Sequence, residues 1–210
     1  MKTLIIDCDG VLYPGYLQPI SMLVSALEKE AFSRNITKEQ YKRISAETLK
    51  KKEVGMYNFI LNLVGKDMNL YDKFCKHMID SIDYSNIKRD DELYNLLLKV
   101  VKKHEICIFT NNHFYHLEKI YKNLFGKKME ELPFKSYDIC STFKDGFFHP
   151  KQSIDGYNNF LKMINKKKDE CIVYDDSWMN IKRCIENNIP YEYITNSNTL
   201  KIALNKLLNQ

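Results

Sequence analysis

Short apolar runs alternate with amphipathic segments in the second half of the chain. After Asp90, runs of β-prone residues are separated by stretches in which apolar residues recur every three or four positions. The strands we expect are 106–109, 136–140, 171–174 and 191–194, and the helices are 93–101, 113–124, 153–164, 177–186 and one that begins at residue 199. One more apolar run, 3–6, stands at the N-terminus. Strands that alternate with helices predict a parallel sheet covered on both faces.

The segment from Gln18 to about Asp80 has a different pattern. Apolar residues at 20, 23, 24, 27 and 31 follow helical spacing, and the amphipathic stretches that follow are 41–49, 57–64 and 70–79. We therefore predict an α/β fold: a Rossmann-like parallel sheet sandwiched by helices, with an all-helical cap inserted after the first strand. The expected boundaries are 1–15 and 88–210 for the core and 16–87 for the cap.

Composition places the chain among globular proteins. With 210 residues, 44% of them hydrophobic, it can bury a full core. Its six cysteines are scattered and form no CxxC pair, so we expect buried, reduced thiols in a reducing compartment. No apolar run reaches the roughly 18 residues that span a bilayer, and the N-terminus has no signal-peptide pattern. These features predict a cytoplasmic protein with no membrane partner.

The formal net charge of +5 comes with lysine runs such as Lys50–Lys52 and Lys166–Lys168. Such runs are usually solvated, and neither an aromatic platform nor a known reader motif accompanies them. We therefore expect no nucleic acid polymer as partner. A mild positive field helps to collect small anionic substrates instead.

Chemically active side chains follow the expected strands where those strands end. In chain order they are Asp7, Asp9, Thr110, Asn111, Asp175 and Asp176, with Lys151 at the beginning of a helix. Because parallel sheets bind ligands at the carboxyl ends of their strands, we expect these residues to share one site. Carboxylates in this position suit Mg²⁺ bound together with a substrate phosphate. Thr110, just ahead of a helix, is a seat for an anion.

Four segments in a fixed order resemble a known family. DCDGVLYP, IFTNN, HPK and VYDDSWMN are similar to the four motifs of the haloacid dehalogenase-like (HAD) superfamily of phosphatases, and the helical insertion resembles that family's helical cap. Within the superfamily, the LYP after the acidic motif, the KKKEVG stretch near Glu53 and Gly55, IFTNN and DDSWMNI most resemble the pyrimidine 5′-nucleotidase branch.

The resemblance implies a role for each residue of the site. Asp7 would attack phosphorus and form an aspartyl-phosphate. Asp9 would act as general acid and base, and its backbone carbonyl would ligate the metal. Thr110 and the amide of Asn111 would bind the phosphoryl oxygens, and Lys151 would offset the charge of the transition state. Asp7 and the pair Asp175/Asp176 would complete the Mg²⁺ site, and Asp176 is the preferred direct ligand.

Two ionisation states follow from this assignment. At its ordinary pKa of about 3.9, Asp7 is already ionised at neutral pH. Asp9 must hold a proton, and we expect the charge of Asp7 to raise its pKa. Mg²⁺ and Lys151 together would cancel the repulsion between Asp7 and a phosphate.

Other residues invite metal or stacking roles. His113 and His116 lie three positions apart but lack a third ligand, so we expect one near the phosphate pocket and the other in solvent. Trp178 is expected to pack in the core or lid and not to stack on a base. The lid aromatics that could contact a substrate are Tyr13, Tyr16 and Tyr57.

The sequence thus predicts a Mg²⁺-dependent phosphomonoesterase that acts on a small phosphorylated metabolite. The favoured substrate is a pyrimidine nucleoside monophosphate. A sugar-phosphate mutase is the enzymatic alternative, because DCDGV resembles mutase motifs as well. A HAD-fold binding protein without turnover is the alternative from another class, and the oligomeric state is open.

Overall fold

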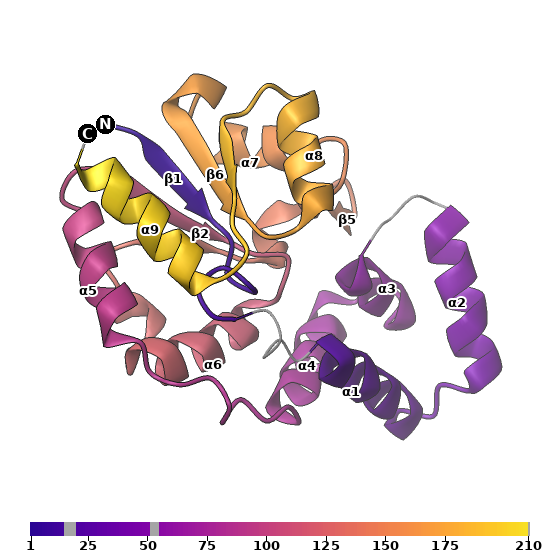
Figure 1. Cartoon of the computed structure of the whole chain (residues 1–210). Coiled ribbons are helices and arrows are strands. Elements are labelled where there is room, and N and C mark those ends of the chain that lie inside the picture. Colours follow the sequence, from indigo (N-terminus) through magenta and orange to yellow (C-terminus); the bar gives the residue numbers. More distant parts are fainter. Residues whose placement is uncertain (15–19, 51–54, 210) are drawn as a thin grey trace.

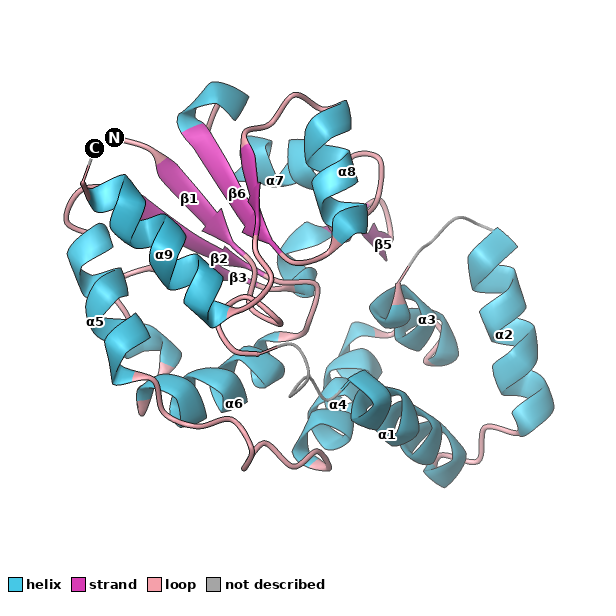
Figure 2. Ribbon diagram, in the orientation of Figure 1, coloured by secondary structure: helices cyan, strands magenta, loops and turns pink. Residues whose placement is uncertain are grey.

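A five-stranded parallel sheet forms the core, in a computed structural model that describes residues 1–14, 20–50 and 55–209 (Figures 1 and 2). Its order is β3-β2-β1-β6-β7, and each neighbouring pair runs parallel. The strands are β1 (Thr3–Ile6), β2 (Glu105–Phe109), β3 (Lys135–Tyr137), β6 (Cys171–Asp175) and β7 (Tyr191–Tyr193). The predicted Rossmann-like parallel sheet is confirmed.

Strand β1 occupies the centre of the sheet, and its carboxyl end lies level with the ends of β2 and β6. Ile6 pairs with Ile108 of β2 on one side and with Tyr174 of β6 on the other. The amide of Asp7 continues the ladder by donating to the carbonyl of Tyr174 at 2.9 Å. The next residues of all three strands therefore emerge together at the carboxyl edge.

Alternating side chains of the central strands face two helical layers. Leu4 and Ile6 pack with α5, α6 and α9, whereas Ile5, Cys107 and Phe109 pack with α7 and α8. These helices are α5 (Asp91–Val100), α6 (Phe114–Phe125), α7 (Gly156–Met163), α8 (Trp178–Glu186) and α9 (Ser197–Leu208). Short 3-10 turns connect some elements: η2 (Met129–Glu131), η3 (Ile139–Thr142) and η4 (Lys168–Glu170). Both faces are covered, as a parallel sheet requires.

Four helices follow β1 in sequence and lie beyond the carboxyl ends of the strands (Figure 1). They are α1 (Ile20–Ser33), α2 (Lys38–Lys50), α3 (Met56–Leu63) and α4 (Met68–Asp80). Helix α1 packs on α4, and α3 packs on both α2 and α4. Within 20–50 and 55–80 the structure shows helices and turns and no strand, as the apolar spacing predicts.

A small antiparallel hairpin was not predicted. It consists of β4 (Phe143–Lys144) and β5 (Phe147–Phe148), joined by a turn in which Asp145 and Gly146 both have positive φ. The Asn58 side chain of α3 makes two hydrogen bonds to this hairpin. It accepts from the Phe148 amide at 2.7 Å and donates to the Phe148 carbonyl at 2.8 Å. Strands of two residues are too short to carry a periodic pattern.

Two predicted boundaries are wrong. The strand predicted at 136–140 ends at Tyr137, because the carboxylate of Asp138 accepts the amide of Ser141 and begins η3. The helix predicted from residue 153 begins at Gly156, because the amide of Ser153 bonds to the carbonyl of Pro150 in a preceding turn. Local turn bonds thus replace regular structure at both places.

The burial of most cysteines agrees with the expectation drawn from composition. All six are free thiols, and five of them are buried. None of the described helices is both long enough and apolar enough to cross a membrane.

We expect Phe160→Ala to destabilise the core beneath the site. The Phe160 ring stacks on Phe109 with centroids 3.9 Å apart, and both rings are buried. Removing such a ring costs about 3–5 kcal/mol of the free energy of unfolding. Urea unfolding followed by circular dichroism measures the loss.

Ile202→Ala on α9 is the matched control, since Ile202 is 69% exposed. Its effect should stay within about 0.5 kcal/mol. Equal losses in the two variants would show that the stack does not contribute in this way.

Candidate active site

A buried lysine lies between two carboxylates at the carboxyl edge of the sheet. Lys151 Nζ is 2.5 Å from Asp7 Oδ1 and 3.0 Å from Asp175 Oδ2, and its side chain is 1% exposed. Burial opposes the charged form, but the attraction of Asp175 and Asp7 outweighs it and raises the pKa of Lys151. The lysine is therefore a fixed positive charge at the end of β1 and β6.

Two further residues, Asn111 and Gly156, hold Lys151 in place. The Asn111 side chain accepts from the backbone amide of Lys151 at 2.9 Å and donates to Gln152 Oε1 at 2.8 Å. Gly156 lets the chain fold back on itself, since an added Cβ would lie 2.3 Å from the carbonyl oxygen of Pro150. The loop that carries the lysine is thus joined to the end of β2 and packed against α7.

Asp175 and Asp176 have different surroundings. Asp175 is fully buried, and its oxygens accept from the amide of Ser177 and the side chains of Lys151, Tyr157 and Asn180. Asp176 instead lines the cavity above the strand ends. Burial and the neighbouring Asp175 raise the pKa of Asp176 to about 6. Of the two carboxylates, Asp176 is the one that faces the cavity.

Asp7 does not have the ordinary ionisation that the sequence suggested. Burial raises its pKa well above the usual range; Lys151 opposes this effect, and the charges of Asp175 and Asp9 add to it. Oxygens of Asp7, Asp175 and Asp176 lie within 4.8 Å of one another. Two like charges 4 Å apart repel by about 4 kcal/mol at an effective dielectric constant of 20. Three carboxylates against one ammonium leave an excess negative charge, and this set of oxygens fits a divalent cation.

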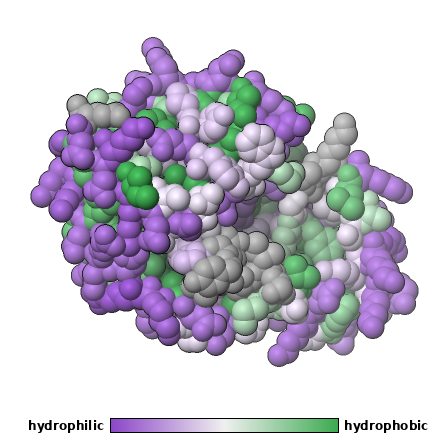
Figure 3. All heavy atoms as spheres, in the orientation of Figure 1, coloured by the Kyte–Doolittle hydropathy of each residue, from purple (hydrophilic) through white to green (hydrophobic). Residues whose placement is uncertain are grey.

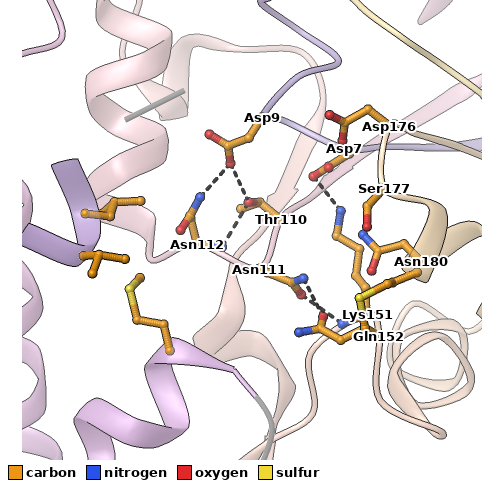
Figure 4. A pocket seen from close by; sticks show the side chains of 14 residues that line it. Asp7, Asp9, Thr110, Asn111, Asn112, Lys151, Gln152, Asp176, Ser177 and Asn180 are labelled. Carbon is orange, nitrogen blue, oxygen red and sulfur yellow. Dashed lines mark hydrogen bonds and ion pairs between the residues drawn. The ribbon is translucent and has the colours of Figure 1, made fainter. Parts of the chain in front are cut away.

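Asp9 also departs from expectation, in the opposite direction. Its side chain turns toward Asn112, which donates to Oδ2 at 2.7 Å, and away from the pair of Asp7 and Lys151 (Figure 4). Tyr13 and His116 both bond to Oδ1. Burial favours the neutral acid, but the attraction of His116 and these hydrogen bonds prevail and lower the pKa of Asp9. The raised pKa predicted from the charge of Asp7 is wrong for the protein without ligand.

The residues surround a cavity of about 470 Å³ between the sheet edge and the four-helix layer. Figure 3 shows the surface hollowed between these two parts. The polar floor is formed by Asp7, Asp9, Thr110, Lys151 and Asp176. The apolar wall is formed by Leu23, Val24, Met56 and Met179. The cavity therefore combines a charged end with an apolar side.

The structure brings together all seven residues predicted for the site. Thr110 is buried, lines the cavity and donates weakly to Asp9 Oδ2 at 3.4 Å. Its hydroxyl also accepts from the amide of Asn112 at 3.0 Å, which fixes the turn after β2. Only Asp175 is absent from the residues that line the cavity.

One histidine does lie beside the pocket, since His116 bonds to Asp9, but the expectations of a second histidine in solvent and of a buried Trp178 are wrong. His116 is fully buried and His113 is 1% exposed, so neither lies in solvent. His113 caps α6. One ring nitrogen of His113, a carboxylate oxygen of Asp138 and the sulfur of Cys140 all lie within 4.8 Å of one another. Trp178 is 61% exposed and packs edge-on against Tyr193. The two imidazoles are buried because they have polar partners there, Asp9 for His116 and Asp72 for His113. Trp178 lies on the solvent-exposed side of α8.

The aromatic residues named for the lid have structural partners. Tyr13 is 1% exposed and donates to Asp9, and Tyr57 donates to Asn112 Oδ1 at 3.2 Å. Tyr16 and Glu53 lie outside the described residues.

Some contributors escaped the sequence analysis. Asn180 and Tyr157 hold Asp175, whereas His116, Asn112 and Tyr13 hold Asp9. Asn112 directly follows a predicted site residue, and Asn180 falls in the first turn after DDS, so position gave a weak signal for these two. Nothing in the sequence connects His116 to a residue 107 positions earlier.

A parallel sheet whose carboxyl edge carries a lysine, paired carboxylates and a cavity defines an α/β protein of the class that binds ligands at this edge. The chain matches the haloacid dehalogenase-like hydrolases over residues 1–183 and belongs to that family.

Solved structures share the fold. CbbY from Rhodobacter sphaeroides, in complex with xylulose-(1,5)bisphosphate, has a TM-score of 0.59 and 10% sequence identity over 91% of this chain and 84% of that chain. The HAD family enzyme BT-2542 from Bacteroides thetaiotaomicron, in complex with magnesium and inorganic phosphate, has a TM-score of 0.52 and 18% identity over 92% and 93%. At these identities the likeness establishes the fold and nothing further.

We expect divalent cation binding to weaken as the pH falls through the pKa of Asp176. This pKa is about 6, so the carboxyl is anionic at pH 7.5 and mostly protonated at pH 5.5. A cation needs the anionic form, and the dissociation constant for Mg²⁺ should rise by about fourfold or more over this interval. Isothermal titration calorimetry at the two pH values measures it.

Asp145→Asn in the hairpin is the control, because Asp145 lies in a turn outside the cavity. It should reproduce the pH effect, whereas Asp176→Asn should bind the cation weakly at both pH values. A dissociation constant that is equal at pH 5.5 and 7.5 in the unmodified protein would contradict the assignment of Asp176.

Proposed function

We propose that the protein is a Mg²⁺-dependent phosphomonoesterase that acts through an aspartyl-phosphate on Asp7. The contact of Lys151 with Asp7 at the floor of the cavity carries this proposal. It supplies a nucleophile and a counter-charge within one fixed geometry. Asp176, Thr110 and Asp9 face the same cavity and provide the remaining groups that the reaction needs.

Asp7 is held in one orientation for attack. Its Oδ1 accepts from Lys151 and, at 2.7 Å, from the amide of Cys8. In the first step a carboxylate oxygen of Asp7 forms a bond to phosphorus while the bond from phosphorus to the leaving oxygen breaks. In the second step water attacks the same phosphorus, and phosphate leaves as Asp7 is regenerated.

Three groups would bind the phosphoryl oxygens. They are the hydroxyl of Thr110, the backbone amide of Asn111 and the ammonium group of Lys151. The first two stand at the end of β2, just before α6, where amide groups favour an anion. Because Lys151 is buried and already charged, it can stabilise the negative charge of the transition state without reorganising.

The oxygen-rich edge supports a magnesium site. Mg²⁺ would be held by Asp7, Asp176 and the backbone carbonyl of Asp9. Asp175 would contribute indirectly, because its carboxylate holds Lys151 in position. When bound, Mg²⁺ supplies positive charge that offsets the repulsion between the carboxylates and the phosphate. The raised pKa of Asp7 supports this need, because Lys151 alone does not restore its ordinary ionisation.

We assign the proton transfers to Asp9. It lies two residues after Asp7 and lines the same cavity. Protonated, it would give its proton to the leaving oxygen, and as carboxylate it would take one from the attacking water. Its lowered pKa in the protein alone favours the base form, and the negative charge of a bound phosphate would raise it.

The cavity wall supports a substrate whose leaving group can pack the face of a flat ring against apolar side chains. We assign 16–87 to a cap, whose α1 and α3 contribute Leu23, Val24 and Met56 to the wall. Among the described residues that line the cavity, Lys151 is the one cationic side chain, and it is paired with two carboxylates. A second phosphate, as on a phosphosugar bisphosphate, finds no free cation there. A pyrimidine nucleoside monophosphate fits both features, which favours hydrolysis over the mutase reaction.

We expect phosphate release from p-nitrophenyl phosphate that requires Mg²⁺ and Asp7. Asp7→Asn removes the nucleophile but preserves the size of the side chain, and kcat should fall by about 10³-fold or more. A chelator should abolish the activity, and restored Mg²⁺ should recover it. Colorimetric phosphate release measures both effects.

Asp83→Asn is the matched control, because Asp83 lies on the segment after α4 and outside the cavity. It should keep the activity of the unmodified protein. No phosphate release under any metal condition would favour the binding protein without turnover, and isomerised glucose 1-phosphate would favour the mutase.

We expect pyrimidine nucleoside monophosphates to give a higher kcat/KM than sugar phosphates. Met56→Ala shortens the apolar wall and should raise KM for the nucleotides by about 3- to 10-fold, since a buried methylene group contributes about 0.8 kcal/mol. Met68→Ala, on the surface of α4, should leave KM unchanged. A preference for sugar phosphates would contradict the substrate while leaving the hydrolase intact.

A further inference from the structure

Behind Asp9 lies a buried imidazole that none of the steps above uses. His116, in the first turn of α6, is fully buried. Its Nε2 is 2.7 Å from Asp9 Oδ1, and its Nδ1 is 2.7 Å from the hydroxyl of Tyr84. Both ring nitrogens are therefore engaged, one with the candidate acid and base and the other with a phenol.

The contact with Asp9 fixes the role of Nε2. Asp9 as carboxylate can only accept, so Nε2 must donate to it. Nδ1 bonds to the hydroxyl of Tyr84, and the Tyr84 ring stands edge-on to the imidazole, with ring centroids 5.4 Å apart. Tyr84 thus holds the ring in the orientation that presents Nε2–H to Asp9, as outer hydrogen bonds do for other functional histidines.

The remaining donors leave Asp9 little freedom. Asn112 Nδ2 holds Oδ2 at 2.7 Å, and Tyr13 bonds to Oδ1 beside His116. The Asp9 side chain is 14% exposed, and that part faces the cavity. Oδ1 already accepts two hydrogen bonds, so Oδ2, held by Asn112 and only weakly by Thr110, is the oxygen better able to exchange a proton.

We infer that His116, oriented by Tyr84, is the positioning residue for the proton transfers of Asp9. The inference rests on the proposed function, because it needs Asp9 to be the general acid and base. The Nε2–H of His116 fixes Oδ1, so that the proton on Asp9 is aimed at the leaving oxygen. Loss of this bond lets the carboxyl rotate and weakens proton transfer while Asp7, Lys151 and the metal site stay intact.

The leaving group provides the test. Phenolate leaves poorly and needs a proton from Asp9, whereas p-nitrophenolate leaves well and needs little help. The measured quantity is the ratio of kcat/KM for p-nitrophenyl phosphate to kcat/KM for phenyl phosphate, since kcat/KM reports the step in which the leaving group departs. A change in protein stability lowers both values and leaves the ratio alone.

We expect His116→Leu to raise this ratio by about tenfold or more, since acid catalysis contributes about 10²–10⁴-fold. His116→Gln, whose amide nitrogen can reach the place of Nε2, should bring the ratio back toward that of the unmodified protein. Tyr84→Phe keeps the packing volume and should raise the ratio by a smaller factor. Tyr84→Phe also tests the inference if His116→Leu does not fold.

His113→Leu is the matched control. His113 is as buried as His116 and lies at the beginning of the same helix, but its Nε2 lies near Asp72 and not near Asp9. This variant should lose stability and keep the ratio. An unchanged ratio in folded His116→Leu or Tyr84→Phe would overturn the inference, as would equal ratios in His116→Leu and His113→Leu.

A double-mutant cycle of Asp9 and His116 separates the inference from the proposed function. Asp9→Asn should raise the ratio by itself, and adding His116→Leu should change it no further, because His116 acts through Asp9. If Asp9→Asn leaves the ratio unchanged, the role proposed for Asp9 fails. If Asp9→Asn raises it and His116→Leu raises it again by the full factor, Asp9 keeps its role and the inference about His116 is wrong.

Discussion

The site depends on one buried ammonium group that bonds to two carboxylates. Lys151 reaches Asp7 and Asp175 from a loop that follows the hairpin, so three distant segments must meet at one point of the sheet. Removing one partner of such a buried set typically costs 3–5 kcal/mol, because a charge is left without compensation. The parallel register of β1 and β6 makes the meeting possible, since Asp7 and Asp175 leave the sheet at the same level. Fold stability and candidate chemistry therefore share the same atoms.

Two aspartates separated by a single residue have opposite electrostatic surroundings. Asp7 is buried among like charges, and Lys151 compensates it only in part, so its pKa is raised. Burial favours the neutral form of Asp9 too, but the attraction of His116 and the hydrogen bonds that Asp9 accepts prevail and lower its pKa. The motif DCDG states which residue types are present, but segments far along the chain decide their ionisation. A nucleophile and a proton carrier can thus stand side by side on one strand end and differ in chemistry.

The sequence predicted the elements whose signal is local. Apolar spacing located the parallel strands and the four helices after β1, and strand ends located six of the seven residues of the candidate site, with Lys151 expected at the beginning of a helix. It did not predict the hairpin, because two-residue strands have no period. It also placed one of His113 and His116 in solvent and Trp178 in the core or lid, because exposure there depends on partners such as Asp72 and Tyr193 that are distant in sequence. Both pKa expectations failed for a similar reason: the one for Asp7 used the unperturbed value, and the one for Asp9 counted only the charge of Asp7.

The two hydrogen bonds between Asn58 and the hairpin constrain how the four helices α1–α4 can move. The Asn58 side chain bonds both the amide and the carbonyl of Phe148, and this pair is buried. Tyr57, one residue earlier, bonds to Asn112 at the end of β2. Helix α3 is thereby attached to the sheet side of the cavity, while α1 packs on α4 and α2 packs on α3. Any widening of the entrance that keeps these bonds leaves α3 in place, so the other walls of the cavity have to move relative to α3.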